Sequence, residues 1–137
     1  MSIRLLIADD DPLMRVLVAV SLADVAETVE AASGDEVLRL LSERDFDLVL
    51  LNWDLPGPNG LQVLRTVRAS GSRMPIIIVT VEADRGQVVK ALHAGASDYV
   101  IKPVEIASLR ERVAIHCQST PTNTKRRGRD SNPRTPL

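Results

Sequence analysis

Aromatic residues and cysteines are scarce in this chain. Its 137 residues contain one phenylalanine, one tryptophan and one tyrosine, although 45% of them are hydrophobic. The core must therefore be built from Val, Ile, Leu and Ala, a mixture that favours helices packed on buried strands. Because Cys117 is alone, an internal disulfide and a thiolate metal site are excluded. We expect this residue to act as a small buried apolar side chain.

Long hydrophobic runs are also missing. No apolar stretch approaches the roughly 18 residues that cross a membrane, and no basic segment followed by an apolar one opens the chain. We therefore expect a cytoplasmic protein without a membrane partner. The length suits a single domain, since a domain of this size buries about 68% of the surface that its unfolded chain exposes.

Charge is divided unevenly along the chain. Residues 1–118 carry 12 basic and 17 acidic side chains, a net charge of −5, whereas residues 119–137 carry a net charge of +4. The basic residues of the second part are Lys125, Arg126, Arg127, Arg129 and Arg134. This division predicts a globular domain over residues 1–118 and a basic, disordered tail or linker over residues 119–137. Such a tail could neutralise nucleic-acid phosphates. More commonly, a basic tail of this kind is a linker, the remnant of a lost output domain or a foreign addition. We therefore do not expect nucleic acid as a partner.

Short apolar runs alternate with stretches of helical period. Four apolar runs predict buried strands. They cover Ile3–Ala8, Asp47–Leu51, Pro75–Val79 and Tyr99–Ile101, and a fifth strand with a weaker pattern is predicted at Glu27–Ala31. The first helix is expected to follow with Asp11 as its N-cap and Pro12 as its first residue. The regular alternation predicts an α/β fold with a doubly wound, five-stranded parallel sheet and helices on both faces.

Polar residues follow the predicted strands at their carboxyl ends, where a sheet of this kind binds ligands. They are Asp9, Asp10, Asp11, Asn52, Asp54, Thr80, Glu82 and Lys102. The adjacent carboxylates of Asp9 and Asp10 repel each other unless a cation lies near them, and an oxygen-rich site suits Mg²⁺. The acidic triplet alone leaves a second interpretation open, in which Asp11 caps a helix and the other two carboxylates are only solvated.

In this order and spacing, these residues resemble the receiver domain of two-component response regulators, in particular the single-domain chemotaxis type. The two most specific stretches are Asn52–Pro56 (NWDLP) and Ala94–Pro103 (AGASDYVIKP). The resemblance covers about residues 2–117. It implies the flavodoxin-like strand order 2-1-3-4-5 and a signalling module rather than an enzyme.

The resemblance also implies a magnesium site. In receiver domains a carboxylate after the third strand attacks the phosphorus of a phosphodonor, and Mg²⁺ neutralises charge on the transferred oxygens. By position, Asp10 would bind the ion directly, Asp9 would bind it through water, and Asp54 would bind it through its backbone carbonyl. Asn52 stands at the phosphoacceptor position beside the same ion.

Further positions match the catalytic and switching residues of the family. Lys102 would offer its ammonium group to a phosphoryl oxygen, and Thr80 would offer its hydroxyl. A movement of Thr80 would free Tyr99 to turn inward. The peptide bond before Pro103 would be cis.

The phosphoacceptor position is where this chain departs from the family. An amide has no carboxylate oxygen with which to displace a leaving group, so we expect Asn52 to form no acyl phosphate. The missing charge removes roughly 4 kcal/mol of attraction for a unit charge about 4 Å away at an effective dielectric of 20, and we expect weaker Mg²⁺ binding rather than none. Asp54 is expected to be a solvated loop carboxylate, not a substitute acceptor. Two explanations for Asn52 stay open. It is either an engineered exchange that locks the unphosphorylated state, or it belongs to a natural receiver that signals by binding alone.

The resemblance implies protein partners, namely a sensor histidine kinase or phosphotransfer protein and a downstream protein. The downstream protein is expected on the face made by the fourth helix, the fifth strand and the fifth helix. This face carries Gln87, Lys90, Ala91, Tyr99 and Arg112. We expect a monomer or a weak homodimer. His93 and His116 are expected to have structural or surface roles.

Three other functions compete with a receiver module in which the formation of an acyl phosphate is disabled. The chain could be the regulatory domain of a truncated DNA-binding transcription factor, or an interaction module that works without phosphorylation. The third is a flavodoxin-like cofactor binder. It is disfavoured because three aspartates after the first strand would repel a phosphate.

Overall fold

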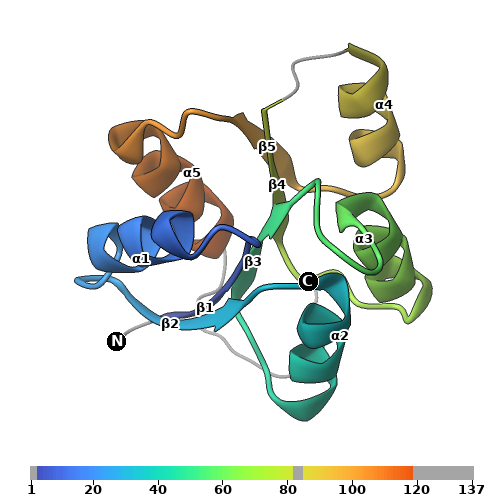
Figure 1. The fold of residues 1–137 in the computed structure, drawn as a ribbon, viewed down its shortest axis with the longest axis horizontal. Coiled ribbons are helices and arrows are strands. Elements are labelled where there is room, and N and C mark those ends of the chain that lie inside the picture. Colours follow the sequence, from blue (N-terminus) through green and yellow to red (C-terminus); the bar gives the residue numbers. More distant parts are fainter. Residues whose placement is uncertain (1–2, 82–84, 119–137) are drawn as a thin grey trace.

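The computed structural model describes residues 3–81 and 85–118, and within them five strands form one parallel sheet. The strand order is β2-β1-β3-β4-β5 (Figure 1). The strands are β1 Ile3–Ala8, β2 Ala26–Ala31, β3 Leu48–Asn52, β4 Ile76–Thr80 and β5 Asp98–Ile101. The predicted doubly wound α/β fold and its strand order are confirmed. Glu82 and the tail predicted over residues 119–137 lie outside the described residues.

Five helices cover the two faces of this sheet. They are α1 Pro12–Ser21, α2 Gly34–Glu43, α3 Gly60–Ala69, α4 Arg85–His93 and α5 Ile106–Gln118. Side chains of α1 and α5 form one core with Leu50 and Ile77, while those of α2, α3 and α4 form a second core with Leu51 and Ile78 (Figure 1). The central strands lie between two layers of helices, which explains why their sequences are continuously apolar. Across residues 3–81 and 85–118, no helix is long and apolar enough to cross a membrane.

Helix α1 begins where the sequence predicted. The carboxylate of Asp11 accepts a hydrogen bond of 3.0 Å from the backbone N–H of Leu13, and Pro12 is the first helical residue. The cap satisfies an N–H group that has no partner within the helix, and proline loses nothing at this position. Because Asp11 serves as the cap, Asp9 and Asp10 remain as the acidic pair at the edge of the sheet.

Helix α1 is apolar on the side that faces solvent as well as on the side that faces the sheet. Val18 faces the sheet and is buried. Four aliphatic side chains, spaced three and four residues apart along α1, are between 48% and 75% exposed. They are Leu13, Val16, Leu17 and Val20. The core therefore depends on one side of α1, and the other side forms an apolar strip on the surface.

Strands β3 and β4 begin and end one residue later than predicted. Asn52 lies opposite Val79 in the ladder, and Thr80 lies opposite Ile101. Apolar runs indicate which residues are covered by helices, whereas hydrogen bonding to neighbouring strands carries each strand one residue further. Asn52 and Thr80 are therefore held in the sheet rather than in the loops after it.

Gly60 allows α3 to begin directly against the end of β3. A Cβ atom at this position would lie 2.6 Å from the backbone oxygen of Asn52 and 2.8 Å from Cα of Trp53. The N–H of Gly60 donates to the carbonyl of Trp53 at 2.8 Å. Reciprocal hydrogen bonds between Asn59 and Gln62 cap the same helix end. These contacts fix the backbone that carries Asn52.

Cys117 should react very slowly with thiol reagents. Its side chain is half-buried on α5 and packs against the core shared with α1. Burial raises the pKa of its thiol from 9.0 to about 12, and the carboxylate of Asp47 acts in the same direction. Only the thiolate reacts, so at pH 8 we expect alkylation by iodoacetamide to be roughly 1000-fold slower in the folded protein than in urea.

The same pKa shift predicts a loss of stability at high pH. The thiol of Cys117 ionises near pH 9 in the unfolded chain and near pH 12 in the folded one. Its contribution to stability is therefore complete below about pH 9 and declines as the pH rises toward 12. Equal alkylation rates in the folded and unfolded protein would show that the thiol is not buried as described.

Candidate functional site

The carboxyl edge of the sheet gathers the buried polar side chains of the protein. Within the part of the chain that the structure describes, only three polar or charged side chains are buried, with exposed fractions of 3% to 5%. They are Asp9 after β1, Asn52 at the end of β3 and Thr80 at the end of β4. Burying polar groups costs free energy unless they are paired. Their concentration at one edge therefore marks this edge as the candidate functional site.

Asp9 and Lys102 form the central ion pair of the site. The Nζ atom of Lys102 lies 2.8 Å from Oδ2 of Asp9, and the two side chains are 19% and 5% exposed. The other carboxylate oxygen of Asp9, Oδ1, accepts a hydrogen bond of 2.9 Å from the backbone N–H of Asp11. Both oxygens of Asp9 are thus engaged, and the ammonium group of Lys102 balances its buried negative charge.

The amide of Asn52 binds the loop that follows β3. Its Nδ2 atom donates a hydrogen bond of 3.1 Å to the backbone oxygen of Asp54. The side chain of Asp54 is exposed, as the sequence predicted. A carboxylate at position 52 could not make this contact, because an ionised carboxylate only accepts hydrogen bonds. The amide therefore ties the site to the loop in a way that a phosphoacceptor aspartate would not.

Arg15 supports the site, although no pattern in the sequence indicated it. Its guanidinium group donates a hydrogen bond of 2.7 Å to the backbone oxygen of Asp9 and pairs with Glu30 at 2.9 Å. These contacts hold the turn after β1 against the end of β2. Arg15 is one of many basic residues in the sequence, and only the pairing of β1 with β2 brings it to Glu30.

The oxygens at this edge suit a small divalent cation. Asp9, Asp10 and the carbonyl of Asp54 offer oxygen ligands, which Mg²⁺ prefers, and Asp10 is exposed. Over residues 3–81 and 85–118 no group of three His, Cys, Asp or Glu side chains could hold a metal, so an ion here would depend on two carboxylates, a carbonyl and water. Lys102 already bonds to Asp9, and Asn52 already bonds to the carbonyl of Asp54. A bound ion would have to compete with both contacts.

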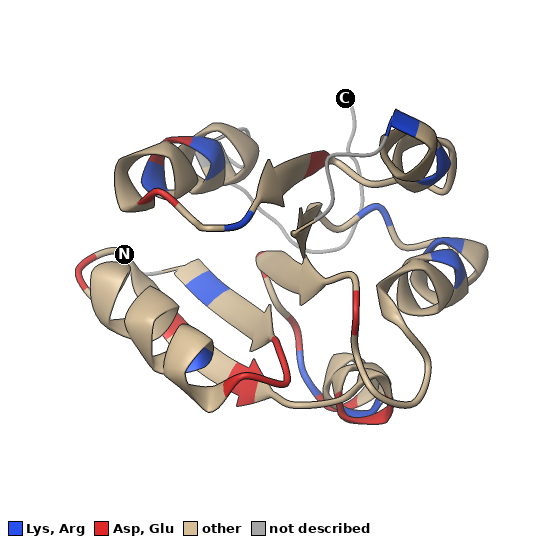
Figure 2. Ribbon diagram, turned by 45° about the horizontal axis from the view of Figure 1, so that its top comes forward, with Lys and Arg blue, Asp and Glu red and all other residues tan. Residues whose placement is uncertain are grey.

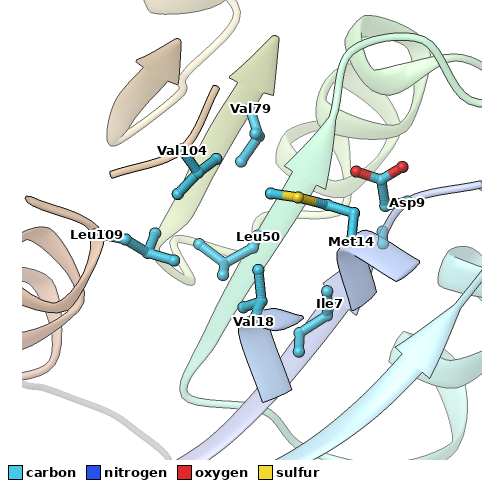
Figure 3. A pocket seen from close by; sticks show the side chains of 9 residues that line it. Ile7, Asp9, Met14, Val18, Leu50, Val79, Val104 and Leu109 are labelled. Atoms are coloured by element: carbon cyan, nitrogen blue, oxygen red, sulfur yellow. The ribbon is translucent and has the colours of Figure 1, made fainter. Parts of the chain in front are cut away.

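The floor beneath Asp9 is apolar. A cavity of about 10 Å³ lies between α1, the sheet and α5, and Figure 3 shows the carboxylate of Asp9 at its rim. Met14, Leu50, Val79 and Leu109 are among the side chains that line it. A void of this size and lining has too few polar partners to hold a water molecule. The site therefore lies on a medium of low dielectric, which strengthens the attraction between Asp9 and Lys102.

Two of the residues predicted to form a switch, Thr80 and Tyr99, lie side by side next to the site. Thr80, Tyr99 and Trp53 line a second cavity of about 10 Å³ between the sheet and α4. Tyr99 is half-buried on β5, which is an edge strand. The backbone N–H of Lys102 donates to the carbonyl of Thr80 at 2.7 Å, and the bond between Lys102 and Pro103 is cis, as predicted.

Two residues predicted for the partner surface do not lie on the surface in the expected way. Ala91 is 2% exposed and belongs to the core beneath α4, so its placement on the surface was wrong. The Oε1 atom of Gln87 is buried at the second cavity. Helical periodicity in α4 is weak for small and polar residues, so the sequence did not identify which side faces the sheet. Lys90 is exposed, as expected.

Asp98 anchors α5 to the edge strand β5. Its carboxylate pairs with the guanidinium group of Arg112, and its other oxygen lies 3.0 Å from Nε2 of His116. His116 therefore has a structural contact, in agreement with the role expected for it. His93 is exposed in the last turn of α4, where a cation suits the helix dipole.

Comparisons with known proteins agree with this fold. The family model described as the response regulator receiver domain matches residues 5–114. The chain is 35% identical over 116 residues to the chemotaxis protein CheY-3 of Vibrio cholerae, which covers 82% of this chain and 89% of the relative. It is 36% identical over 114 residues to the chemotaxis protein CheY of Pseudomonas aeruginosa, covering 80% and 92% of the two chains. Among solved structures, the receiver domain of the Francisella response regulator 1452 has a TM-score of 0.82 at 26% identity and covers 85% of this chain and 98% of its own.

Proposed function

This chain belongs to the response regulator receiver family, and we propose that it is a receiver module in which Asn52 disables the formation of an acyl phosphate. The module would act in two-component phosphorelay signalling by binding Mg²⁺ and protein partners. Receiver domains interact with histidine kinases and phosphotransfer proteins, and both relatives named above are chemotaxis proteins. The proposal covers residues 1–118 as the receiver and residues 119–137 as a basic tail or linker. We also propose that the protein is cytoplasmic and that it is a monomer or a weak homodimer.

The buried amide at the end of β3 is the observation that carries this proposal. In phosphoryl transfer to a carboxylate, an oxygen forms a bond to phosphorus while the bond to the leaving group breaks, and the electron pair departs with that group. The amide of Asn52 lacks this nucleophilic oxygen, and its Nδ2 is bound to the carbonyl of Asp54. The test is to restore the carboxylate in Asn52→Asp and to ask whether a small phosphodonor then modifies the protein.

The remaining residues of the edge are assigned roles by their chemistry. We infer that Asp9, Asp10 and the carbonyl of Asp54 hold Mg²⁺, which when bound neutralises charge on phosphoryl oxygens. Lys102 would bind an anionic group through its ammonium, as it now binds Asp9. Thr80 would offer its hydroxyl from the end of β4 to the same group.

Restoring the carboxylate should strengthen Mg²⁺ binding by at least about tenfold. A charge at position 52 adds roughly 4 kcal/mol of attraction per unit charge about 4 Å away at an effective dielectric of 20. Repulsion from Asp9 and Asp10 offsets part of this gain. The exchange also releases the carbonyl of Asp54 from its hydrogen bond to the amide. Trp53 is the only tryptophan and follows Asn52 directly, so its fluorescence can report a Mg²⁺ titration of both chains.

Asp54→Ala is the matched control for this titration. It removes an exposed carboxylate two residues from the site but keeps the backbone carbonyl that the ion would use. We expect the Mg²⁺ affinity of Asp54→Ala to stay close to that of the parent chain, because an exposed charge is screened by solvent. The affinity of Asn52→Asp should differ from the parent chain much more. Equal affinities of the parent chain and Asn52→Asp would contradict the proposed effect of the amide.

We propose that a downstream protein binds the face formed by α4, β5 and α5. The exposed side chains of this face include Arg85, Val89, Lys90, Leu92 and Ile101. On this face α4 carries Arg85 and Lys90 but no Asp or Glu (Figure 2), and α5 carries Arg110 and Arg112 beside Glu111. A partner whose interface has an apolar centre and an acidic rim would complement this face.

A further inference from the structure

The turn after β1 carries the two carboxylates that would hold the divalent cation. The peptide group between Asp9 and Asp10 is planar, so the carbonyl of Asp9 and the Cα atom of Asp10 turn together. This carbonyl accepts a hydrogen bond of 2.7 Å from Nη1 of Arg15. Arg15 therefore also fixes the direction in which the chain continues to Asp10.

The remaining contacts of this turn come from the backbone or from the carboxylate of Asp9 itself. The N–H of Asp9 donates to the carbonyl of Ala31 at 3.0 Å, and the N–H of Arg15 donates to the carbonyl of Asp11 at 3.1 Å. The N–H of Asp11 donates to Oδ1 of Asp9 at 2.9 Å. The contact between the guanidinium group and the carbonyl of Asp9 comes from a side chain, so a substitution can remove it and leave these backbone contacts in place.

Arg15 is itself held by Glu30 on β2. Its Nε atom lies 2.9 Å from Oε1 of Glu30, and the side chains of Arg15 and Glu30 are 17% and 40% exposed. A guanidinium group presents its donors in a rigid planar fork, so it bonds to Glu30 and to the carbonyl of Asp9 at the same time. Glu30 also balances the charge of Arg15, which would otherwise repel a cation at the acidic pair.

We propose that Arg15 is a positioning residue for the divalent cation and that Glu30 holds and neutralises it. Arg15 does not touch the ion in this arrangement. It fixes the peptide group between Asp9 and Asp10 before the ion arrives, which lowers the cost of ordering the turn on binding. This inference rests on the proposed function, since it adds two residues to the site that is proposed to bind Mg²⁺.

Arg15→Met removes the guanidinium group and keeps an unbranched side chain. In the full chain, we expect Mg²⁺ to bind about tenfold more weakly to this variant, as for other residues that orient the ligands of a metal. Trp53 fluorescence measures the titration, both in the parent chain and in Asn52→Asp. Glu30→Gln leaves the charge of Arg15 unbalanced and should weaken Mg²⁺ binding about threefold.

Amide hydrogen exchange without Mg²⁺, followed by NMR, tests the positioning directly. The N–H of Asp11 bonds to Oδ1 of Asp9, so its exchange rate reports whether the turn keeps its form. In Arg15→Met we expect this amide to exchange about fivefold faster than in the parent chain, as follows from losing one hydrogen bond that holds the turn. A residue that only stabilised the fold would change the exchange of amides throughout the sheet instead.

Arg4→Met is the matched control, because Arg4 and Glu27 form a similar pair between the same two strands at their other end. The Nε atom of Arg4 lies 3.2 Å from Oε1 of Glu27. Arg4→Met should keep both the Mg²⁺ affinity and the exchange rate of Asp11 within about twofold of the parent chain. If Arg15→Met fails to fold, Arg15→Lys serves as the second variant. It keeps the charge but not the fork, and it should weaken Mg²⁺ binding at least about threefold.

Two results would overturn the positioning. They are an exchange rate of Asp11 within about twofold of the parent in a folded Arg15 variant, and an equal change in Arg4→Met. Faster exchange with an unchanged Mg²⁺ affinity would overturn the link between Arg15 and the ion. Absence of Mg²⁺ binding in both the parent chain and Asn52→Asp would count against the proposed function, and the exchange rates would still decide whether Arg15 holds the turn.

Discussion

Incubated with acetyl phosphate and Mg²⁺, Asn52→Asp should gain the mass of one phosphoryl group, while the parent chain should gain none. The exchange supplies the missing nucleophile at the end of β3, where Gly60 and the ladder with β4 hold the backbone in place. Lys102 and the acidic pair after β1 are already present to bind the phosphoryl group and the metal. Intact-mass measurement of both chains after the same incubation decides between these outcomes.

Two further variants establish where and how the phosphate is bound. Asn52→Asp combined with Lys102→Ala should be modified far more slowly, because the ammonium group that would bind the phosphoryl oxygens is missing. Removing Mg²⁺ with a chelator should suppress the reaction as well. Asp54→Asn in the parent chain tests the substitute acceptor. Phosphate that appears on the parent chain and disappears in Asp54→Asn would show that Asp54, and not residue 52, is the nucleophile.

Leu64→Ala should lower the free energy of unfolding by about 2–5 kcal/mol. Leu64 is 0% exposed on α3 and belongs to the core that α2, α3 and α4 form on one face of the sheet. Removing it leaves a cavity among side chains that are held by the strands and cannot close the gap. Urea denaturation followed by circular dichroism measures the change.

Leu61→Ala is the matched control on the same helix. Leu61 is half-buried, so its truncation removes less buried surface and should cost less than half as much free energy. Both variants should keep the m-value of the parent chain, since the surface exposed on unfolding changes little. Equal losses in the two variants would show that Leu64 does not occupy the core position described.

Much of the fold could be predicted because the central strands are covered on both faces. β1 was predicted at Ile3–Ala8 and lies there, since six residues of one apolar run cannot be read as an amphipathic helix. The cap at Asp11 was predicted for a similar reason, because capping depends on residues two or three apart. β3 and β4 were displaced by one residue, since their ends depend on pairing with other strands.

The candidate site was predicted less completely than the fold. The resemblance identified Asp9 and Lys102, but they are 93 residues apart, and nothing local indicated that the ammonium group would bind Asp9. Gln87 was expected on the surface, although its side-chain oxygen is buried. Ala91 was placed on the wrong side of α4 for the same reason, because small and polar residues carry little hydrophobic period.

The alternation of strands and helices, the start of α1 and the set of polar residues at strand ends could all be predicted from the sequence, because each depends on neighbours along the chain. The folded structure was needed to show that Lys102 pairs with Asp9 and that the amide of Asn52 binds the carbonyl of Asp54. It was also needed to show that Gln87, whose side-chain oxygen is buried and unpaired, lines the same cavity as Tyr99. These contacts could not be predicted because hydrogen bonds and ion pairs require atoms within about 3 Å of each other. Packing between distant segments, rather than residue type, decides which atoms come that close.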